Sequence, residues 1–584
     1  MDHAYEANEN NEQTETVPTH ASDECLEQVV PSQEPHQDII FRSPLPYNPI
    51  VVPPTGLTLH GYVMHNIENY LDRVALVDTS DGRQYTYGQV QHLVKSVASG
   101  LWNRYAIRKG DVVLVVLPNI AEFFIFVLGV FSIGAIYSGS NPAAHESEIH
   151  EQASNSRAKL VITDLKTYTK VEALGVPVVV VAPGEVPEGS HSHLSLFEAD
   201  GSQAPEVEIS EHDVCALPYS SGTTGVCKGV MITHRNVIAN LSQTLGELER
   251  AYAQGLIPDG EEHVVLGLMP FFHIYGICGI CCASMRLKGK VVVMARYNLQ
   301  DFLAILLKHG VTFAPIVPPI LLQLVKTDLN FDPSKLKLKS VLTAAAPLGI
   351  ELQRAFEAKF PGVEVHQAYG LTEYSCVTIS HCDPSNGRGP SKPGSVGFLL
   401  PGLELKFRDP STGLSLPANT PGEICVRGES TMKGYFKNPA ATAETIDSEG
   451  WLHTGDVGYI DDDGDIFIVE RMKELIKYKG FQVPPAELEA ILISHPAIAD
   501  AGVIPIPDEE AGEIPAACVV LKPDCFISPA EIQAFVASKV STYKQVRHVE
   551  FLASIPKSSA GKILRRVLKE QVLKNSKASN GNSL

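Results

Sequence analysis

The sequence lacks a long apolar run and a surplus of positive charge. Its most apolar stretch, EFFIFVLGVFSIGAIY at Glu122–Tyr137, is shorter than the roughly 20 residues that a membrane-spanning helix needs. It follows a strand-like VVLVVLP at Val112–Pro118, so we expect a buried helix packed on a sheet and no transmembrane segment. The 47 Lys and Arg are outnumbered by 67 Asp and Glu, giving a formal net charge of −20, which disfavours nucleic acid as a partner.

The beginning of the chain also lacks basic residues. The first 40 residues hold ten Asp or Glu and no Lys or Arg, which is typical neither of a secretory signal nor of an organelle transit peptide. Polar, acidic residues cannot bury enough apolar area to offset the entropy of ordering, so we predict a disordered acidic tail over residues 1–45. A solvated extension is preferred over a partner-binding arm, and no obligate protein partner is evident.

The sequence has 11 cysteines in 584 residues, which is too few for a disulfide-rich protein. Without a secretory signal we expect reduced thiols and a cytoplasmic protein. The single CxxC, within Cys278–Cys282, lies in an apolar run with no second pair, so buried small hydrophobes are preferred over a metal site. The final Asn-Ser-Leu weakly resembles a peroxisomal address, so the peroxisome is an alternative location, as is the surface of the endoplasmic reticulum.

Strand-like and helical segments alternate over most of the chain. Strands are expected at residues 263–270, 290–296, 311–318 and 338–345, with helices at 298–309 and 349–360, which indicates parallel sheets covered by helices. Residues 413–465 are rich in turn residues and predict an antiparallel, barrel-like part. We expect an α/β large domain of two αβα subdomains plus this part at 46–472, a mobile α+β domain at 473–569, and a flexible tail at 570–584.

The strongest motif is YSSGTTGVCKGVMITHRN at Tyr219–Asn236. Glycines let a backbone approach an anion, and the neighbouring amides and hydroxyls can then surround a phosphate while Lys228 adds a positive charge. The spacing is not that of the nucleotide P-loop, because Gly229 follows the lysine. A surface turn is the less favoured interpretation.

Four further segments are weak hypotheses when taken singly. QAYGLTE at Gln367–Glu373 offers an aromatic face and hard oxygens for Mg²⁺. WLHTGDVGY at Trp451–Tyr459 places Asp456 where it can accept ribose hydroxyls, although an Asx turn fits too. ERMKELIKYKGFQ at Glu470–Gln482 is a charge run at a domain boundary. IPKSSAGKILRR at Ile555–Arg566 puts Lys562 after a turn of small residues.

All five motifs, in this order, resemble the adenylate-forming superfamily of acyl-CoA synthetases, firefly luciferase and peptide-synthetase adenylation domains. GEICVRG (Gly422–Gly428), MKGYFKNPAAT (Met432–Thr442) and the segments Gly450–Gly464 and Lys473–Ala490 are especially similar to plant 4-coumarate–CoA ligases and their ligase-like relatives. The resemblance covers about Tyr47 to Lys569. It implies ATP, CoA and a carboxylic acid as substrates, Mg²⁺ as cofactor, an acyl-adenylate intermediate, and release of pyrophosphate and AMP.

The resemblance also implies residue roles. Catalytic positions would be Lys562, which bridges carboxylate and phosphate, His273 beside the carboxylate, and Lys477 and Gln482 in the CoA step after the small domain rotates about Lys473. The nucleotide and CoA would be bound by Ser220, Ser221, Gly222, Thr223, Thr224, Gly225, Lys228, Gln367, Ala368, Tyr369, Gly370, Thr372, Asp456, Arg471, Lys473, Lys479 and Gly480. Glu373 would ligate Mg²⁺. The acyl group would be lined by Tyr275, Leu342, Ala344, Ala345, His366, Ser375, Cys376 and Val377.

This sequence differs from the family that it resembles mainly at positions expected in the acyl pocket. Cys227 and Glu470 stand where the family usually has proline and aspartate, which are mild changes. Where hydroxycinnamate ligases commonly have Lys-Ser-Gly, this chain has Leu342-Thr343-Ala344. Losing the lysine removes a donor for a phenolic oxygen, and each CH₂ buried at an apolar site contributes about 0.8 kcal/mol. We therefore expect a medium- to long-chain or hydroxylated fatty acid, with hydroxycinnamate as the alternative.

Two other classes of function compete with an acyl-CoA ligase. A non-catalytic nucleotide- or acyl-binding module is disfavoured because Lys562, Glu373, Asp456 and Arg471 are all retained. A carrier-loading adenylation domain is disfavoured because no segment of the roughly 80 residues expected for an attached carrier domain follows Lys569.

Overall fold

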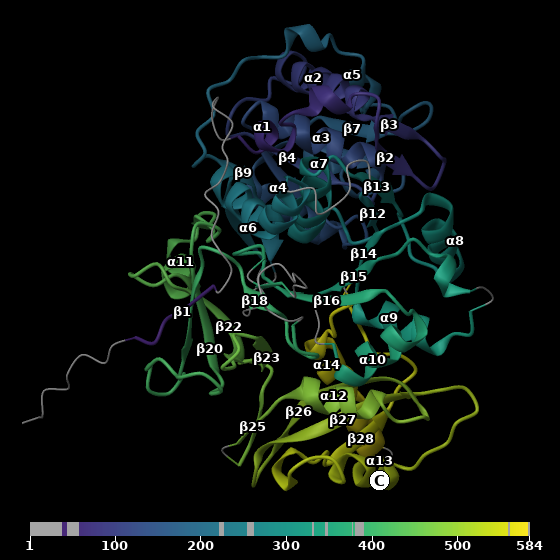
Figure 1. The fold of residues 1–584 in the computed structure, drawn as a ribbon, viewed down its shortest axis with the longest axis vertical. Coiled ribbons are helices and arrows are strands. Elements are labelled where there is room, and N and C mark those ends of the chain that lie inside the picture. Colours follow the sequence, from purple (N-terminus) through teal and green to yellow (C-terminus); the bar gives the residue numbers. More distant parts are fainter. Residues whose placement is uncertain are drawn as a thin grey trace, which may run out of the picture. The chain divides into compact units, whose positions relative to one another are not determined.

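The fold is taken from a computed structural model, in which the chain divides into two units, Met1–Asp38 and Ile39–Leu584. The structure describes residues 38–43, 58–220, 227–253, 262–329, 332–344, 348–376, 378–379, 391–479, 481–558 and 561–581. Helices and sheets alternate along Ile39–Leu584 as the sequence predicts, with a large N-terminal part and a small C-terminal part (Figure 1). Among the described residues no helix is both long and apolar enough to span a bilayer.

The first large sheet has the order β10-β11-β9-β5-β4-β6-β7-β8, with β21 paired to β11. Its strands are β4 Val112–Val116, β5 Ile136–Gly139, β6 Ala158–Asp164, β7 Val178–Val181, β8 His191–Ser192, β9 Val214–Ala216, β10 Tyr219–Ser220, β11 Lys228–Thr233 and β21 Gly434–Tyr435. Strands β4 to β9 pair in parallel, whereas β10, β11 and β21 pair antiparallel. The phosphate-loop motif thus connects two antiparallel neighbours at one edge of a parallel sheet.

Helices that accompany this sheet include α1 Leu59–Val63, α2 Tyr87–Asn103, α3 Ala121–Ser132, α4 Glu146–Ser156, α5 Leu194–Phe197 and α6 His234–Ala253. The apolar run is α3 followed by β5, and every residue from Ala121 to Phe131 is buried, which confirms the expected buried helix. Gly129 allows α3 to approach α2 closely, because a Cβ at this position would lie 2.8 Å from the Val97 Cβ.

The second large sheet has the order β18-β17-β16-β15-β14-β12-β13-β2-β3. Its strands are β2 Val74–Asp78, β3 Gln84–Thr86, β12 Val264–Gly267, β13 Lys290–Val293, β14 Phe313–Ile316, β15 Ser340–Thr343, β16 Glu364–Tyr369, β17 Thr378–Ile379 and β18 Phe398–Leu399. The six strands from β16 to β2 pair in parallel. Helices α7 Ala283–Arg286, α8 Leu299–His309, α9 Pro318–Lys326 and α10 Ile350–Lys359 lie in this part of the chain.

The ends of α8 follow from local chemistry. The Asn298 side chain accepts a hydrogen bond from the Asp301 amide, and Gly310 ends the helix with a φ of 61°, a conformation that suits glycine. Cys278, Cys281 and Cys282 lie in a π-helix, Tyr275–Cys282, and are buried. All nine described cysteines are free thiols, as expected.

The turn-rich segment forms an antiparallel sheet of order β1-β19-β20-β22-β23, with α11 Pro439–Thr445 beside it in sequence. Its strands are β1 Phe41–Arg42, β19 Glu404–Arg408, β20 Gly422–Arg427, β22 Leu452–Ile460 and β23 Ile466–Arg471. The antiparallel prediction is confirmed. Strand β1 falls inside the predicted acidic tail, because Phe41 and Arg42 pair with β19.

The last part of the chain forms a fourth sheet of order β25-β24-β27-β26, with β28 parallel to β27. Its strands are β24 Ile476–Tyr478, β25 Phe481–Val483, β26 Ile498–Asp508, β27 Gly512–Leu521 and β28 His548–Phe551, and its helices are α12 Pro485–Ile493, α13 Pro529–Ala537 and α14 Arg565–Gly581. Helix α14 continues into the range predicted as a flexible tail. The small α+β part has its own apolar cores, centred on residues such as Ile476, Leu488 and Ile504.

Candidate functional site

Asp456 lies at a junction between the antiparallel sheet and the second parallel sheet. It pairs across strands with Arg471, and the Arg471 Nε lies 3.1 Å from the Asp456 Oδ1. The Tyr369 hydroxyl, from the end of β16, donates to the Asp456 Oδ2 at 2.7 Å. Burial raises the pKa of Asp456 above its usual value, while Arg471 and Tyr369 oppose that rise. The sheets thus hold a carboxylate, a guanidinium and an aromatic ring together, a set suited to a ribose and a base.

Glu373 is a second point of convergence. Its Oε1 accepts hydrogen bonds from the Ser220 hydroxyl at 2.9 Å and from the Tyr435 hydroxyl at 2.8 Å. The Lys228 ammonium lies 5.0 Å from the centre of the Tyr435 ring. The described ends of the phosphate-loop motif therefore meet the Thr-Glu segment. Ser221, Gly222, Thr223, Thr224 and Gly225 lie outside the described residues.

The donor chemistry around Glu373 fits Mg²⁺. A carboxylate is the hard oxygen ligand that this ion prefers, and hydroxyl donors to one oxygen fix its orientation. Thr372 is half-buried beside it in sequence. Glu373 would hold the ion, which would neutralise phosphate charge when bound.

Lys562 comes from the C-terminal part of the chain. Its backbone closes a turn, since its amide donates to the Ser558 hydroxyl and its carbonyl accepts from the Ser558 amide. Burial is the main cause that lowers the pKa of the Lys562 ammonium, and the charge of Arg471 adds to it; Glu474 and Asp456 act in the opposite direction. The Lys562 Nζ lies 3.8 Å from the Glu474 Oε1. Arg471 and Asp456, which form the ion pair of the Asp456 centre, therefore also act on the Lys562 ammonium.

Most of the expected acyl-pocket residues that the structure describes lie in or just after strands β15 and β16. Leu342 on β15 pairs with His366 on β16, and Ala344 follows the end of β15. Carboxyl ends of parallel strands are where ligands bind in open α/β sheets. His366 makes an ion pair with Glu364, with 3.1 Å between Nε2 and Oε2. Ala345 and Val377 lie outside the described residues.

His273 and Tyr275 border the π-helix. His273 keeps part of its surface exposed to solvent, while the protein around its ring lowers the pKa of the imidazole. The Tyr275 amide donates to the His273 Nδ1 at 3.3 Å, which orients the ring. Burial raises the pKa of Tyr275, so its phenol stays protonated.

The segment from Gly370 to Cys376 is a tight loop. A Cβ at Gly370 would collide with the Ser375 carbonyl oxygen, and Ser375 itself has a φ of 68°. The Asn240 side chain on α6 binds the Cys376 backbone at both its amide and its carbonyl. Gln367 is buried, whereas Ala368 and Tyr369 are half-buried at the strand end.

The residues expected in the CoA step lie apart from the Asp456 centre in the interactions of the described chain. Lys477 and Gln482 are backbone partners in the β24–β25 strand pair, and Lys479 makes an ion pair with Glu510. Lys473 follows Arg471 by two positions. Gly480 lies outside the described residues. The roles of these residues in a rotated orientation stay predictions.

Three residues beside these centres did not emerge from sequence reasoning. Tyr435 lies in the family-like segment Met432–Thr442, but nothing in its neighbouring sequence shows that it reaches Glu373. Asn240 belongs to no motif. Glu474 looks like one member of a charge run in the sequence, whereas in the structure it is an ion-pair partner of Lys562.

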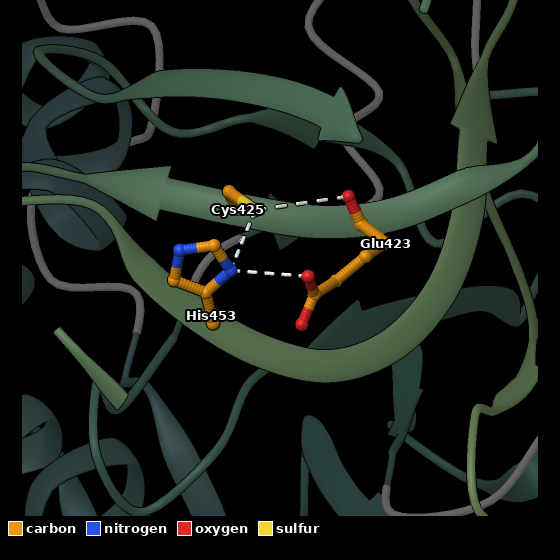
Figure 2. Close-up of side chains that lie close together, drawn as sticks. All are labelled: Glu423, Cys425 and His453. Carbon is orange, nitrogen blue, oxygen red and sulfur yellow. Dashed lines mark hydrogen bonds and ion pairs between the residues drawn. The ribbon is translucent and has the colours of Figure 1, made fainter. Parts of the chain in front are cut away.

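Glu423, Cys425 and His453 form a separate cluster on the neighbouring strands β20 and β22 (Figure 2). The His453 Nδ1 lies 3.0 Å from the Glu423 Oε2 and 3.4 Å from the Cys425 Sγ. Burial is the main cause that raises the pKa of the Cys425 thiol, and the Glu423 carboxylate adds to the rise, while Lys406 and Arg408 oppose it. A thiol that stays protonated is poorly suited to a metal ion. The cluster is best described as a hydrogen-bonded link between strands.

Comparison with known proteins defines the class. Residues 63–436 match the AMP-binding enzyme family, and residues 487–562 match the C-terminal domain of AMP-binding enzymes. The chain belongs to this family, the adenylate-forming superfamily of enzymes.

Particular relatives narrow the class further. The chain is 55% identical over 540 residues to 4-coumarate–CoA ligase-like 1 of Arabidopsis thaliana, covering 92% of this chain and 97% of that protein. It is 42% identical to 4-coumarate–CoA ligase 1 of Solanum tuberosum, with the same shares covered. ATP-bound MatB from Rhodopseudomonas palustris shares the fold, with a TM-score of 0.79, 24% identity, and 88% of this chain and 99% of that chain covered.

Proposed function

We propose that this AMP-forming acid–CoA ligase activates a medium- to long-chain or hydroxylated fatty acid. ATP and the acid would form an acyl-adenylate and pyrophosphate, and CoA would then displace AMP. The juxtaposition that supports this chemistry is Asp456 with Arg471 and Tyr369, close to the charge of Lys562. Fixed groups of this kind can stabilise the charge that develops at phosphorus without a covalent enzyme nucleophile.

Each centre would have its own task. Asp456 and Arg471 would hold the ribose, and Tyr369 would cover the base. Ser220, Lys228 and Glu373 would hold the phosphates, with Mg²⁺ on the Glu373 carboxylate. Lys562 would bridge the carboxylate and the α-phosphate. Because its ammonium is partly removed from water, it would interact more strongly with these negative groups.

The preference for an alkyl chain rests on Leu342. Its side chain is buried and apolar, and its β-sheet neighbour on the same register is His366. The position offers no ammonium to a phenolic oxygen. The higher identity to a ligase-like relative (55%) than to a 4-coumarate–CoA ligase (42%) agrees with a changed acid specificity. Hydroxycinnamate remains the second candidate because the relatives' names contain 4-coumarate.

The test is a panel of acids in which CoA-dependent AMP release is measured. We expect kcat/KM to be higher with lauric, palmitic and hydroxylated fatty acids than with 4-coumaric acid. If 4-coumaric acid is turned over and the fatty acids are not, the proposed preference for alkyl chains is wrong, but the ligase activity is supported. The absence of pyrophosphate exchange with every acid, despite ATP binding, would favour a binding module.

Position 342 can be tested within the same panel. Leu342→Lys should lower kcat/KM for lauric acid at least about tenfold, because an ammonium would be buried against the chain. Leu342→Met keeps the site apolar and about the same size, so it should stay within about threefold of wild type. Equal effects of the two substitutions would remove Leu342 from the acyl pocket.

A further inference from the structure

Arg565 pairs with two buried carboxylates and one partly buried carboxylate. Its guanidinium lies 3.0 Å from the Glu489 Oε2, 3.1 Å from the Glu474 Oε2 and 3.4 Å from the Glu470 Oε2. The Arg565 side chain is 13% exposed, and those of Glu470 and Glu489 are 7% and 10% exposed. Three acidic groups thus share one forked cation in a site with little water, where removal of the cation would leave buried negative charge without compensation.

The carboxylates belong to both sides of the expected hinge. Glu470 is on β23, just before Arg471, whereas Glu474 follows Lys473 and Glu489 lies on α12. Besides Arg565, the Glu470 Oε2 accepts a hydrogen bond from the Ala486 amide at 3.0 Å, in the first turn of α12. Glu470 therefore ties the end of β23 to two separate elements of the C-terminal part.

The same group is connected to Lys562. Glu474 offers one oxygen to Arg565 and the other to Lys562, at 3.1 Å and 3.8 Å. Arg565 is also the first residue of α14, three positions after Lys562. Movement of Arg565 away from Glu470 would displace both the Lys562 turn and the Glu474 carboxylate beside it.

We propose that Arg565 is a positioning residue for acyl-adenylate formation. By binding Glu470 before the hinge and Glu474 and Glu489 after it, Arg565 holds the Lys562 turn near Asp456 and Arg471. Rotation about Lys473 for the CoA step must break the Arg565–Glu470 contact, because the two residues lie on opposite sides of the hinge. This inference rests on the proposed function, and it adds a residue that acts through Lys562 without touching the substrates.

The experiment compares the two half-reactions in full-length Arg565→Gln. Adenylation is measured as lauric-acid-dependent ATP–pyrophosphate exchange, and thioester formation is measured from supplied lauroyl-adenylate and CoA. We expect exchange to fall between about tenfold and a hundredfold, because displacement of a reacting group by about 1 Å has effects of this size. Thioester formation should stay within about threefold of wild type.

Two further variants sharpen the result. Glu470→Gln should give the same kind of selective loss, and the double variant should lose less than the two single effects combined, because both substitutions remove the Arg565–Glu470 contact. Arg566→Gln is the matched control, because the neighbouring side chain is 83% exposed and pairs only weakly with Glu570 among the described residues. It should leave both half-reactions unchanged.

The outcomes separate this inference from the proposed function. Equal losses in both half-reactions would show a merely structural role and overturn the positioning role, as would no loss in either. If Arg565→Gln does not fold, Arg565→Lys, which keeps the charge but loses the fork, must show the same selective loss in smaller measure. If the wild-type enzyme exchanges pyrophosphate with 4-coumaric acid and not with lauric acid, the same comparison is made with 4-coumaric acid and coumaroyl-adenylate. If the wild-type enzyme shows no exchange with any acid, the proposed function is wrong.

Discussion

At the scale of single residues, hydroxyl groups decide how Glu373 is oriented. The sequence motif pointed to Glu373, but its partner Tyr435 lies 62 positions away and only the fold brings the two together. Tyr435 reaches the carboxylate from β21, which pairs with the phosphate-loop strand β11. The same pairing places the Tyr435 ring near Lys228, so one tyrosine contacts an anion and a cation of the proposed phosphate site.

Tyr435→Phe should therefore weaken the use of Mg²⁺. Loss of a group that orients a metal ligand typically costs tenfold or more in metal affinity, so we expect half-maximal activity at about tenfold higher Mg²⁺. The measurement is pyrophosphate exchange over a Mg²⁺ titration at saturating ATP. Tyr297→Phe is the control, because its hydroxyl bonds only to Gln323 on the surface among the described contacts. An unchanged Mg²⁺ curve for Tyr435→Phe would separate Tyr435 from the metal.

Glu489 gives a prediction on pH. Burial raises its pKa from 4.5 to about 7, although Arg565 opposes the rise. The folded protein thus holds this proton more tightly than the unfolded chain does. The resulting contribution to the free energy of unfolding is fully present below about pH 4.5 and is lost as the pH rises through about 7, by roughly 3 kcal/mol.

Glu489→Gln should flatten that decline, because an amide does not titrate. Unfolding midpoints in urea between pH 5 and pH 8 would measure it. Glu487→Gln, two positions earlier on the same helix and half-exposed beside Lys544, should keep the wild-type pH dependence. Parallel curves for wild type and Glu489→Gln would show that Glu489 does not titrate in this range.

At the scale of elements, short sequence motifs predict features that depend on neighbouring residues, such as the ends of helices. Asn298 and Gly310 mark the two ends of α8, and Ser528 begins α13 with a capping box to Glu531. Sites that depend on distant partners could not be predicted in this way. The sequence predicts a ribose-binding role for Asp456 from its turn motif and for Arg471 from the family resemblance. It does not predict that Tyr369 bonds to Asp456, because this contact joins two different sheets.

Strand β1 is the clearest element that the sequence concealed. Two residues are too few for a periodic pattern, and an acidic segment precedes them. Yet Phe41 packs edge-on to Phe407, with 5.7 Å between ring centres, and Arg42 makes an ion pair with Glu404. The Ile39 amide donates to the Ser415 hydroxyl.

Paired truncations test the contribution of β1. Removal of residues 1–37 should leave kcat/KM and the melting temperature unchanged. Removal of residues 1–43 should lower the melting temperature by about 1 °C for each 1 kcal/mol of packing and pairing that is lost, while kcat is retained. Equal melting temperatures of the two proteins, measured by calorimetry, would show that β1 does not stabilise the sheet.

At the scale of the whole molecule, one nucleotide site is expected to serve two reactions. The Asp456 centre belongs to the large N-terminal part, whereas Lys562 and the residues expected to meet CoA belong to the C-terminal part. In this structure Lys562 and Asp456 each act on the pKa of the other, whereas Lys479 makes an ion pair with Glu510. The arrangement therefore suits adenylation, and a rotation would be needed to exchange one set of residues for the other.

Lys562→Ala tests this division of labour. Adenylation should fall at least about a hundredfold, because a preorganised cation at the developing charge is removed. Thioester formation from supplied acyl-adenylate and CoA should be largely retained, since Lys562 would have left the site by then. Lys557→Ala is the control: this lysine lies in the same segment but pairs with Asp500, so it should not separate the two half-reactions. If Lys562→Ala slows both steps equally, a single orientation serves both chemistries and rotation is unnecessary.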